Sequence, residues 1–469
     1  MIKNRTKRKH YQTIFFLTLA VSILLAFRLP GAHALSIEEE RALGKKFLKE
    51  VRNNFEIVDD DFADRYINGL GQYLVRHLET KHFPFHFYII NDRNLNAFAG
   101  PGGHVFVFTG LIEIMDSVDE LAAVISHEIA HVSARHISNR LEEAKKIGLA
   151  TVAGILAGIL LGGEGGGALV SGSMAAGIQA QLAYSREDER QADQLGARYM
   201  REAGFDPGGM IPILNKIQKT RMLDPEAVPP YLLTHPLGPE RIANIEIMLK
   251  SGPEIKDRPA EATLFRSYFL HSKTILRAKY SDPKEAEAEF KRLLERNPGS
   301  PLAHMGLGLV YKRRNEFPLA LKHLEAASKG EPESKTISIY LGEVYQLLGQ
   351  DEKAVPHFLD ALEKDRTDRR ALFLLARSYQ NLGQHNRAIP LFERLSSMEP
   401  VEPEVFYGLG ISYGRQNRLA RAHYYFGIYF KNKRNIEKAL YHLNKARDLA
   451  KDQPTLRERI SRALKDLSG

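Results

Sequence analysis

The chain has 469 residues, a length that usually corresponds to two or three domains. Its 43% hydrophobic and 26% charged residues are ordinary for a globular protein and argue against a chain that is mainly disordered or crosses a membrane many times. Cysteine is absent, which excludes disulfides, thiolate metal sites and a cysteine nucleophile. The net charge of +9 consists of +6 in residues 1–34, −8 in 35–261 and +11 in 262–469. In the last segment, basic and acidic residues alternate along predicted helices, so we predict no nucleic-acid partner.

The first 34 residues have the pattern of a secretory signal peptide. A basic stretch from Lys3 to Lys9 precedes an apolar run of 14 residues over 14–27, and Ala32-His33-Ala34 matches a cleavage site. The run is shorter than the roughly 20 apolar residues of a spanning helix. We therefore predict export to a bacterial periplasm, with an uncleaved anchor as the alternative that Arg28 leaves open.

Residues 35–143 read as helices with one short sheet, so the chain is predicted to be mainly α. The expected elements are helices over 37–51, 62–79 and about 121–143, and strands over 85–90 and 104–109. Pro101-Gly102-Gly103 predicts a turn before the second strand. Ser117 or Asp119 is the expected cap of the third helix.

Residues 144–181 are unusually rich in glycine, which occupies ten of 38 positions. Within them, 147–163 is free of charge and contains Gly154, Gly158 and Gly162, a spacing that lets helices approach closely in membranes. Three interpretations stay open: a glycine-rich lid over the site, a segment that dips into a membrane, or a true span.

Residues 301–434 repeat with a period of 34. Small and large apolar residues recur at fixed offsets, for example at Gly342, Tyr345, Ala354 and Phe358. Four successive units at this period predict tetratricopeptide repeats, which form an all-α solenoid with a concave binding surface. A degenerate unit is expected before them and a partial or capping unit after them.

The third predicted helix contains a candidate metal-binding and catalytic motif, His127-Glu128-Ile129-Ala130-His131. Residues i and i+4 share one helical face, so both imidazoles can bind one metal ion, and Glu128 lies where it can take a proton from the attacking water. Neutral imidazole suits Zn²⁺, and we expect one ion per chain. The alternative is an amphipathic helix with two surface histidines; apolar flanks argue against it.

A second acidic group lies downstream at Glu189 and Asp193, again at i and i+4. One carboxylate can bind the metal while the other orients a histidine. The alternative is a solvated acidic face. His136 is a rival third ligand, but on an ideal helix it lies five residues and about 140° from His131, so we expect a structural or surface role.

The strand over 104–109 precedes the metal-binding helix. Extended substrates commonly add to an exposed sheet edge through main-chain hydrogen bonds. We therefore predict that the strand residues His104, Val105 and Phe106 bind substrate, together with Asn96 upstream of the turn.

These motifs together resemble one zinc peptidase family, which includes the heat-shock HtpX proteases and the CAAX prenyl proteases. The resemblance rests on the HExxH segment, on Tyr184-Ser185-Arg186 followed by Glu189 to Asp193, and on Asn96-Ala97-Phe98-Ala99 before Pro101. It implies a zincin-type α+β domain with His127, His131 and Glu189 as ligands, Glu128 as base and Asp193 holding a ligating histidine. Thr234-His235-Pro236 resembles a segment whose histidine can occupy the open metal position and keep the enzyme latent.

The signal peptide and trailing repeats are similar to a periplasmic branch of that family. This similarity implies a protease domain over 35–261 and a repeat domain over 262–469. It also implies outer-membrane β-barrel assembly as the setting, with unfolded or misassembled outer-membrane proteins as substrates and the assembly machinery as a partner of the repeats. The alternative function is a repeat-based chaperone or adaptor whose protease domain is latent or silent.

Overall fold

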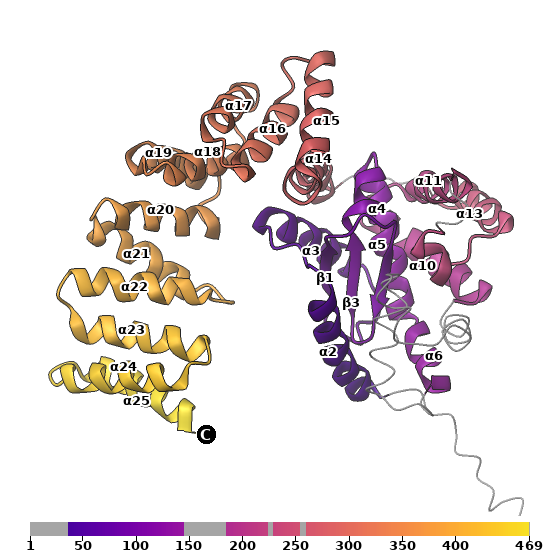
Figure 1. Cartoon of the computed structure of the whole chain (residues 1–469). Helices are drawn as coiled ribbons and strands as arrows, with labels where there is room; N and C mark the ends of the chain where they lie inside the picture. Colours follow the sequence, from indigo (N-terminus) through magenta and orange to yellow (C-terminus); the bar gives the residue numbers. More distant parts are fainter. Residues whose placement is uncertain (1–35, 145–183, 224–227, 254–258, 469) are drawn as a thin grey trace, which may run out of the picture. The chain divides into compact units, whose positions relative to one another are not determined.

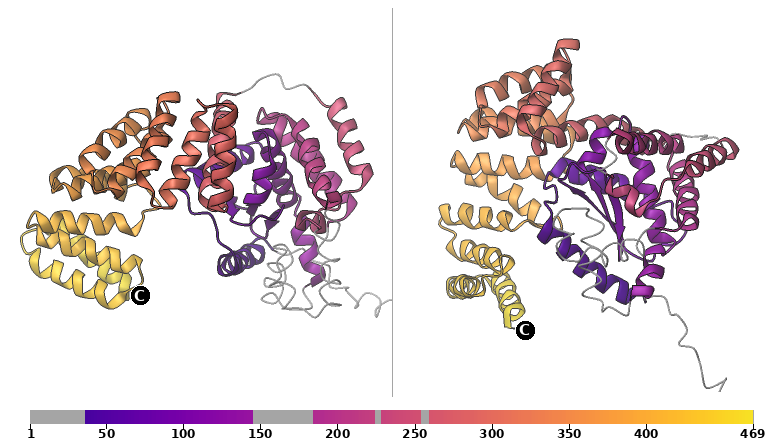
Figure 2. Two further views of the ribbon diagram at one scale, coloured as in Figure 1. Left: turned by 45° about the horizontal axis from the view of Figure 1, so that its top comes forward. Right: turned by 45° about the vertical axis from the view of Figure 1, so that its right-hand side comes forward.

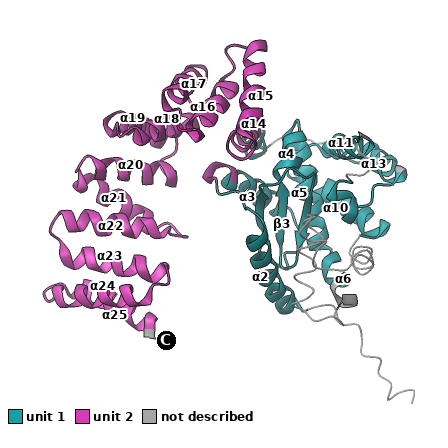
Figure 3. Ribbon diagram, in the orientation of Figure 1, with its two compact units in different colours: residues 1–59, 64–267 teal, residues 60–63, 268–469 magenta. Residues whose placement is uncertain are grey.

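The computed structural model describes residues 36–144, 184–223, 228–253 and 259–468. The chain divides into two compact units (Figure 3): unit 1 takes residues 1–59 and 64–267, and unit 2 takes residues 60–63 and 268–469. The division at 267 falls inside the long helix α14 (Ala260–Tyr280), near the domain boundary expected at 261. The predicted signal peptide and the charge-free run 147–163 lie outside the described residues.

Unit 1 is built around a three-stranded sheet with the order β1-β3-β2. The strands are β1 (His86–Ile90), β2 (Ala97–Gly100) and β3 (His104–Phe108). β3 pairs in parallel with β1 and antiparallel with β2. The predicted strands over 85–90 and 104–109 are thus confirmed, whereas β2 was not expected, because four residues before a turn carry too short a pattern to indicate a strand.

Helices cover both faces of this sheet (Figure 1). On one face Phe47 of α2 packs edge-on against Phe98 of β2 and Phe106 of β3, with ring centroids 6.1 and 5.9 Å apart. On the other face lies α5, which packs against β2 and β3. Every residue of β3 is buried, as expected for a strand that is covered on both sides.

The described helices of unit 1 supply the walls of the site. They are α2 (Ile37–Asn54), α3 (Asp61–Val75), α4 (Thr109–Ile114), α5 (Val118–Ser133), α6 (His136–Ala144), α10 (Arg186–Glu202), the 3₁₀ helix η2 (Pro207–Gly209), α11 (Met210–Leu223), α12 (Pro230–Thr234) and α13 (Pro239–Ser251).

The helix expected over about 121–143 is in fact two helices. α5 ends at Ser133, and Arg135 adopts a left-handed backbone conformation with φ 58° before α6 begins at His136. A non-glycine residue with this φ interrupts the helical ladder and redirects the chain. His136 therefore does not lie where an ideal helix would put it.

Unit 2 is all α, and its helices stack in antiparallel pairs (Figures 1 and 2). After α14 come α15 (Pro283–Arg296), α16 (Pro301–Arg313), α17 (Phe317–Gly330), α18 (Lys335–Leu347), α19 (Asp351–Lys364), α20 (Arg369–Asn381), α21 (His385–Ser396), α22 (Pro403–Arg415), α23 (Leu419–Asn432), α24 (Ile436–Leu449) and α25 (Pro454–Ser468).

The 34-residue period has a direct packing cause. A Cβ on Gly342 would lie 2.5 Å from the ring of Phe358, so the first helix of the pair can approach the second only because this position is glycine. Neighbouring pairs are joined by a repeated polar contact. Gln346 donates to Ser378 Oγ at 2.8 Å, and one period later Gln380 donates to Ser412 Oγ at 2.7 Å. The predicted repeat solenoid is confirmed.

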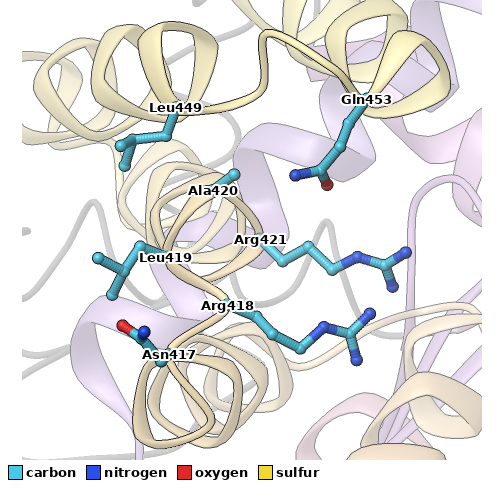
Figure 4. Close-up of a pocket in the computed structure, with 7 residues that line it drawn as sticks. All are labelled: Asn417, Arg418, Leu419, Ala420, Arg421, Leu449 and Gln453. Carbon is cyan, nitrogen blue, oxygen red and sulfur yellow. The ribbon is translucent and has the colours of Figure 1, made fainter.

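A surface pocket of about 550 Å³ lies near the C-terminal end of the repeats (Figure 4). Arg418 and Arg421 extend side by side along it, and their guanidinium groups lie 4.7 and 5.4 Å from the centroid of the Tyr413 ring. The pocket is thus basic. Its lining residues are Asn417, Arg418, Leu419, Ala420, Arg421, Leu449 and Gln453.

In the described part of the chain, none of the helices is both long enough and apolar enough to cross a membrane.

Candidate metal centre

The two histidines of the HExxH segment lie on α5, which is buried almost all round. The helix begins after Ser117, whose Oγ accepts the backbone N–H of Glu120, and its second half is apolar on both sides of the motif. His127 and His131 are 3% and 0% exposed, and their Nε2 atoms lie 3.0 Å apart. The spacing predicted from helical periodicity therefore brings two ring nitrogens to one point.

A carboxylate reaches the same point from α10. A capping box at Ser185 and Asp188 begins this helix, which packs along α5. Glu189, one residue after the box, is 3% exposed. Its Oε1 lies 3.4 Å from His131 Nε2, and its Oε2 lies 3.6 Å from His127 Nε2. Two helices far apart in the sequence thus supply two nitrogens and one carboxylate.

The fourth group is His235, which follows the short helix α12 and is fully buried. Its Nδ1 lies 2.9 Å from Glu189 Oε1 and 3.3 Å from His127 Nε2. Pro236 follows it and disfavours a helical conformation at His235, which has φ −116° and ψ 83°. Ligand atoms of all four residues lie within 4.8 Å of one another.

This group fits a divalent metal ion. Ring nitrogens 3.0 and 3.3 Å apart and a carboxylate are packed together away from water. Among the described residues, His235 Nε2 and both carboxylate oxygens of Glu128 are buried without a hydrogen-bond partner. Buried polar atoms without partners are costly, and a cation bound by nitrogen and oxygen ligands compensates that cost.

Glu128 lies beside the group and is fully buried. Its Oε1 is 3.4 Å from His235 Nε2. Burial raises the pKa of the Glu128 carboxyl group above its ordinary value, because the charged form loses its hydration. Glu128 is thus placed to carry a proton, whereas the four grouped residues beside it are placed to hold a metal.

Comparison with known proteins agrees with this geometry. Residues 62–249 match peptidase family M48, and residues 277–321, 308–369 and 373–426 match the tetratricopeptide repeat. Residues 62–249 thus resemble an M48 peptidase domain, and this part of the chain is called the M48-like domain below. The matched residues 62–249 include all four members of the buried group and Glu128.

Three named proteins are similar to this chain in sequence. The chain is 33% identical over 307 residues to the putative beta-barrel assembly-enhancing protease of Vibrio cholerae. This alignment covers 64% of this chain and 62% of that protein. It is 34% identical over 213 residues to the beta-barrel assembly-enhancing protease of Escherichia coli, covering 45% and 44%. It is 33% identical over 153 residues to the mitochondrial metalloendopeptidase OMA1 of Arabidopsis thaliana, covering 33% and 29%. The chain thus spans less than two-thirds of each relative's length.

His127 and His131 each use the other ring nitrogen for a second contact. His127 Nδ1 lies 3.0 Å from Asp193 Oδ1, the acid predicted to hold a ligating histidine. Asp193 in turn accepts two hydrogen bonds from Arg241, at 2.9 and 2.8 Å. Arg241 also contacts Glu189. Burial raises the pKa of Glu189, but Arg241, His235 and the hydrogen bonds with His131 and His235 together outweigh that effect and hold the pKa well below its usual range.

The second contact of His131 is with His136. The helix break at Arg135 turns the His136 ring back, so that its Nδ1 lies 2.9 Å from His131 Nδ1 and its Nε2 lies 2.8 Å from Gln191 Oε1. His136 is 3% exposed and is therefore not a surface residue. The contact could not be predicted from a single continuous helix, which would place His136 on a different face from His131. His136 is not among the four grouped residues, as the sequence predicted.

Two tyrosines also line the candidate metal centre. Tyr184 stacks on His131 with ring centroids 3.7 Å apart, and Tyr231 stacks on His235 with centroids 4.5 Å apart. Both are buried, which excludes water from the outer faces of the two imidazoles. Tyr184 belongs to a motif already noted beside Glu189, whereas Tyr231 had no sequence signal beyond its place four residues before His235.

The structure contradicts the prediction that a substrate adds to the edge of β3. β3 lies between β1 and β2, so both of its edges are already paired and no substrate strand can add to it. Val105 and Phe106 are core residues with no exposed surface, and His104 stacks on His86. Asn96 is buried, and its backbone carbonyl accepts the N–H of Phe108. Strand order depends on long-range pairing, which the residue pattern of one strand does not reveal.

Proposed function

We propose that the chain is a zinc-dependent endopeptidase of the bacterial periplasm that degrades misfolded or stalled envelope proteins and assists outer-membrane β-barrel assembly. The buried group of His127, His131, Glu189 and His235, with Glu128 beside it, is the observation that carries the proposal. Imidazole and carboxylate ligands favour zinc among the divalent ions. The beta-barrel setting is supported by the names of the relatives, and the periplasm by the predicted signal peptide.

The residues of the site have different roles in the proposed peptide hydrolysis. A zinc ion held by His127, His131 and Glu189 would supply Lewis-acid polarisation of the scissile carbonyl and a lowered pKa for water. Glu128 takes the proton of the attacking water and passes it to the leaving amine as the C–N bond breaks. Asp193 and Arg241 hold His127 and Glu189 in place, and His136 does the same for His131.

His235 gives the site a closed resting arrangement. Its Nδ1 lies within the group of ligand atoms, so His235 would hold the metal together with the other three residues and compete with the peptide carbonyl and water for it. Once it moves away, its ring can donate a hydrogen bond to the oxyanion. The chain is therefore proposed to be latent until a substrate or partner displaces His235.

Replacing His235 with alanine is expected to raise the rate of β-casein cleavage by the zinc-loaded chain several-fold, because the fourth position becomes open. Cleavage should stop with a chelator and return with added zinc. The matched control is His304→Ala, which removes a histidine from the repeats and should leave the rate unchanged. Unchanged or lower activity in His235→Ala would reject capping and indicate a purely catalytic role.

A repeat-based chaperone or adaptor with a silent protease domain is the second candidate. The confirmed repeat array and the inward position of His235 favour it. The repeats are proposed to bind the β-barrel assembly machinery or unfolded outer-membrane proteins. The proposed membrane contact through 147–163 concerns residues outside those that the structure describes.

A further inference from the structure

Unit 2 contains a short segment that comes from far upstream in the sequence. Residues 60–63 group with the repeats rather than with the surrounding chain (Figure 3). The side chain of Asp60 is 0% exposed, although a lone aspartate is seldom fully buried. A carboxylate in such a position needs partners, and the first repeats provide them.

The two carboxylate oxygens of Asp60 have different partners. Oδ1 accepts the backbone N–H groups of Phe62 and Ala63, both at 3.0 Å, and so caps the start of α3. Oδ2 lies 2.5 Å from Lys279 Nζ and 3.7 Å from Arg370 Nη1, and it accepts the Tyr340 hydroxyl at 3.5 Å. Burial raises the pKa of Asp60, but Lys279 and Arg370 outweigh that effect, so the pKa is lowered.

The basic cluster is formed by three cations from three helices: Lys279 of α14, Lys312 of α16 and Arg370 of α20. The ring of Tyr340 lies between two of them, with Lys312 Nζ 5.3 Å and the Arg370 guanidinium 5.0 Å from its centroid. Within this cluster Glu343 contacts Lys312 and Arg370. The repeats thus place three cations beside a single carboxylate of their own, that of Glu343. The carboxylate of Asp60 is the second negative charge in the cluster.

The cluster departs from the repeat pattern that builds the solenoid. The residues one and two periods after Lys312 are Gln346 and Gln380, which hold neighbouring repeats together through serines. The residues one period before and after Arg370 are Thr336 and Glu404. At these two positions the cations join neighbouring repeats through Glu343, where the later repeats use glutamine and serine. Arg370, together with Lys279, also faces Asp60, which lies outside the repeats.

Phe62 provides a second anchor two residues after Asp60. Its ring packs edge-on against Tyr268, with centroids 5.9 Å apart, and it lies against the apolar core of the first repeats. The segment 60–62 is thus held at two points. The acidic residue Asp60 is held by charge, and the aromatic residue Phe62, two positions later, is held by apolar contact.

We propose that Lys279, Lys312, Arg370 and Tyr340 form a peptide-binding site for segments with an acidic residue followed two positions later by an aromatic one. Residues 60–62 are its resident occupant, and a partner segment of the same chemistry exchanges with them. Because the resident is covalently attached, it competes at a high effective concentration, so free peptides bind weakly until it is removed.

The test uses a fluorescein-labelled peptide of residues 58–65 and fluorescence anisotropy with the full-length chain. Asp60→Asn/Phe62→Ala removes both anchors, and it should bind the peptide at least about tenfold more tightly than the wild type does. Adding Arg370→Gln should return binding to the wild-type level or below. Adding Arg377→Gln instead, an exposed arginine two turns further along α20, should leave it unchanged.

Asp60→Asn alone is the second variant, since its Oδ1 still caps α3 while the charge is lost; circular dichroism verifies the fold of every variant. It should bind the peptide more tightly than the wild type does, and a peptide with asparagine at position 60 should bind more weakly than the original. The proposal is overturned if the emptied variants bind no more tightly than the wild type, or if Arg370→Gln has no more effect than Arg377→Gln.

Discussion

Replacing Glu128 with glutamine is expected to reduce cleavage of β-casein by about 10²–10⁴-fold while metal content stays at the wild-type level. Glutamine has nearly the same shape but cannot take a proton from water. Glu128 is not among the four grouped ligand residues, so its replacement leaves them in place. The measurement combines a peptide-cleavage rate with elemental analysis of the same purified sample.

Glu187→Gln is the matched control, because Glu187 lies two residues before the proposed ligand Glu189 but is an exposed member of a surface ion pair with Arg190. It should retain full activity. Glu128→Gln also separates the two candidate functions in a cell. If that variant supports envelope assembly as well as the wild type does, the adaptor function is the correct one and proteolysis is dispensable.

Replacing Arg241 with methionine is expected to destabilise the M48-like domain by about 3–5 kcal/mol in the absence of metal. The Arg241 side chain is 9% exposed, and its guanidinium group contacts the buried carboxylates of Glu189 and Asp193. Its removal leaves these two acids buried beside each other without that cation. A bound divalent ion restores positive charge at Glu189, so the loss should be clearly smaller in the zinc-loaded chain.

Hydrogen–deuterium exchange of peptides from α5 and α10 measures this effect without requiring the whole chain to unfold in one step. In the metal-free variant, exchange should be about 10²- to 10⁴-fold faster than in the wild type, which is the fold-change that corresponds to this loss of stability. Arg186→Met, which breaks an exposed ion pair with Glu240, is the control and should change little. Equal destabilisation with and without zinc would show that Arg241 does not share a charge balance with the metal.

The parts of the site that were predictable depend on local periodicity. His127 and His131 needed only the period of an α-helix to share a face, and the same holds for Glu189 and Asp193 on their helix. The repeats were predictable because their period recurs and each unit packs mainly on its neighbours. These features require no knowledge of how distant segments meet.

The parts that sequence reasoning missed depend on single backbone events or long-range packing. One residue with positive φ, Arg135, turns His136 onto His131, and no helical pattern announces it. The four-residue strand β2 takes one edge of β3 and removes the expected substrate edge. The contact of Asp60 with Arg370 joins residues 310 positions apart, and neither residue has a local signal for it.

The most direct test of the central claim is anomalous X-ray scattering at the zinc absorption edge from crystals of the zinc-loaded full-length chain. We predict one strong peak within bonding distance, about 2.0–2.2 Å, of His127 Nε2, His131 Nε2 and a carboxylate oxygen of Glu189. A peak at other residues, or no peak between α5 and α10 in a zinc-loaded crystal, would contradict the assignment of this buried group as the metal centre.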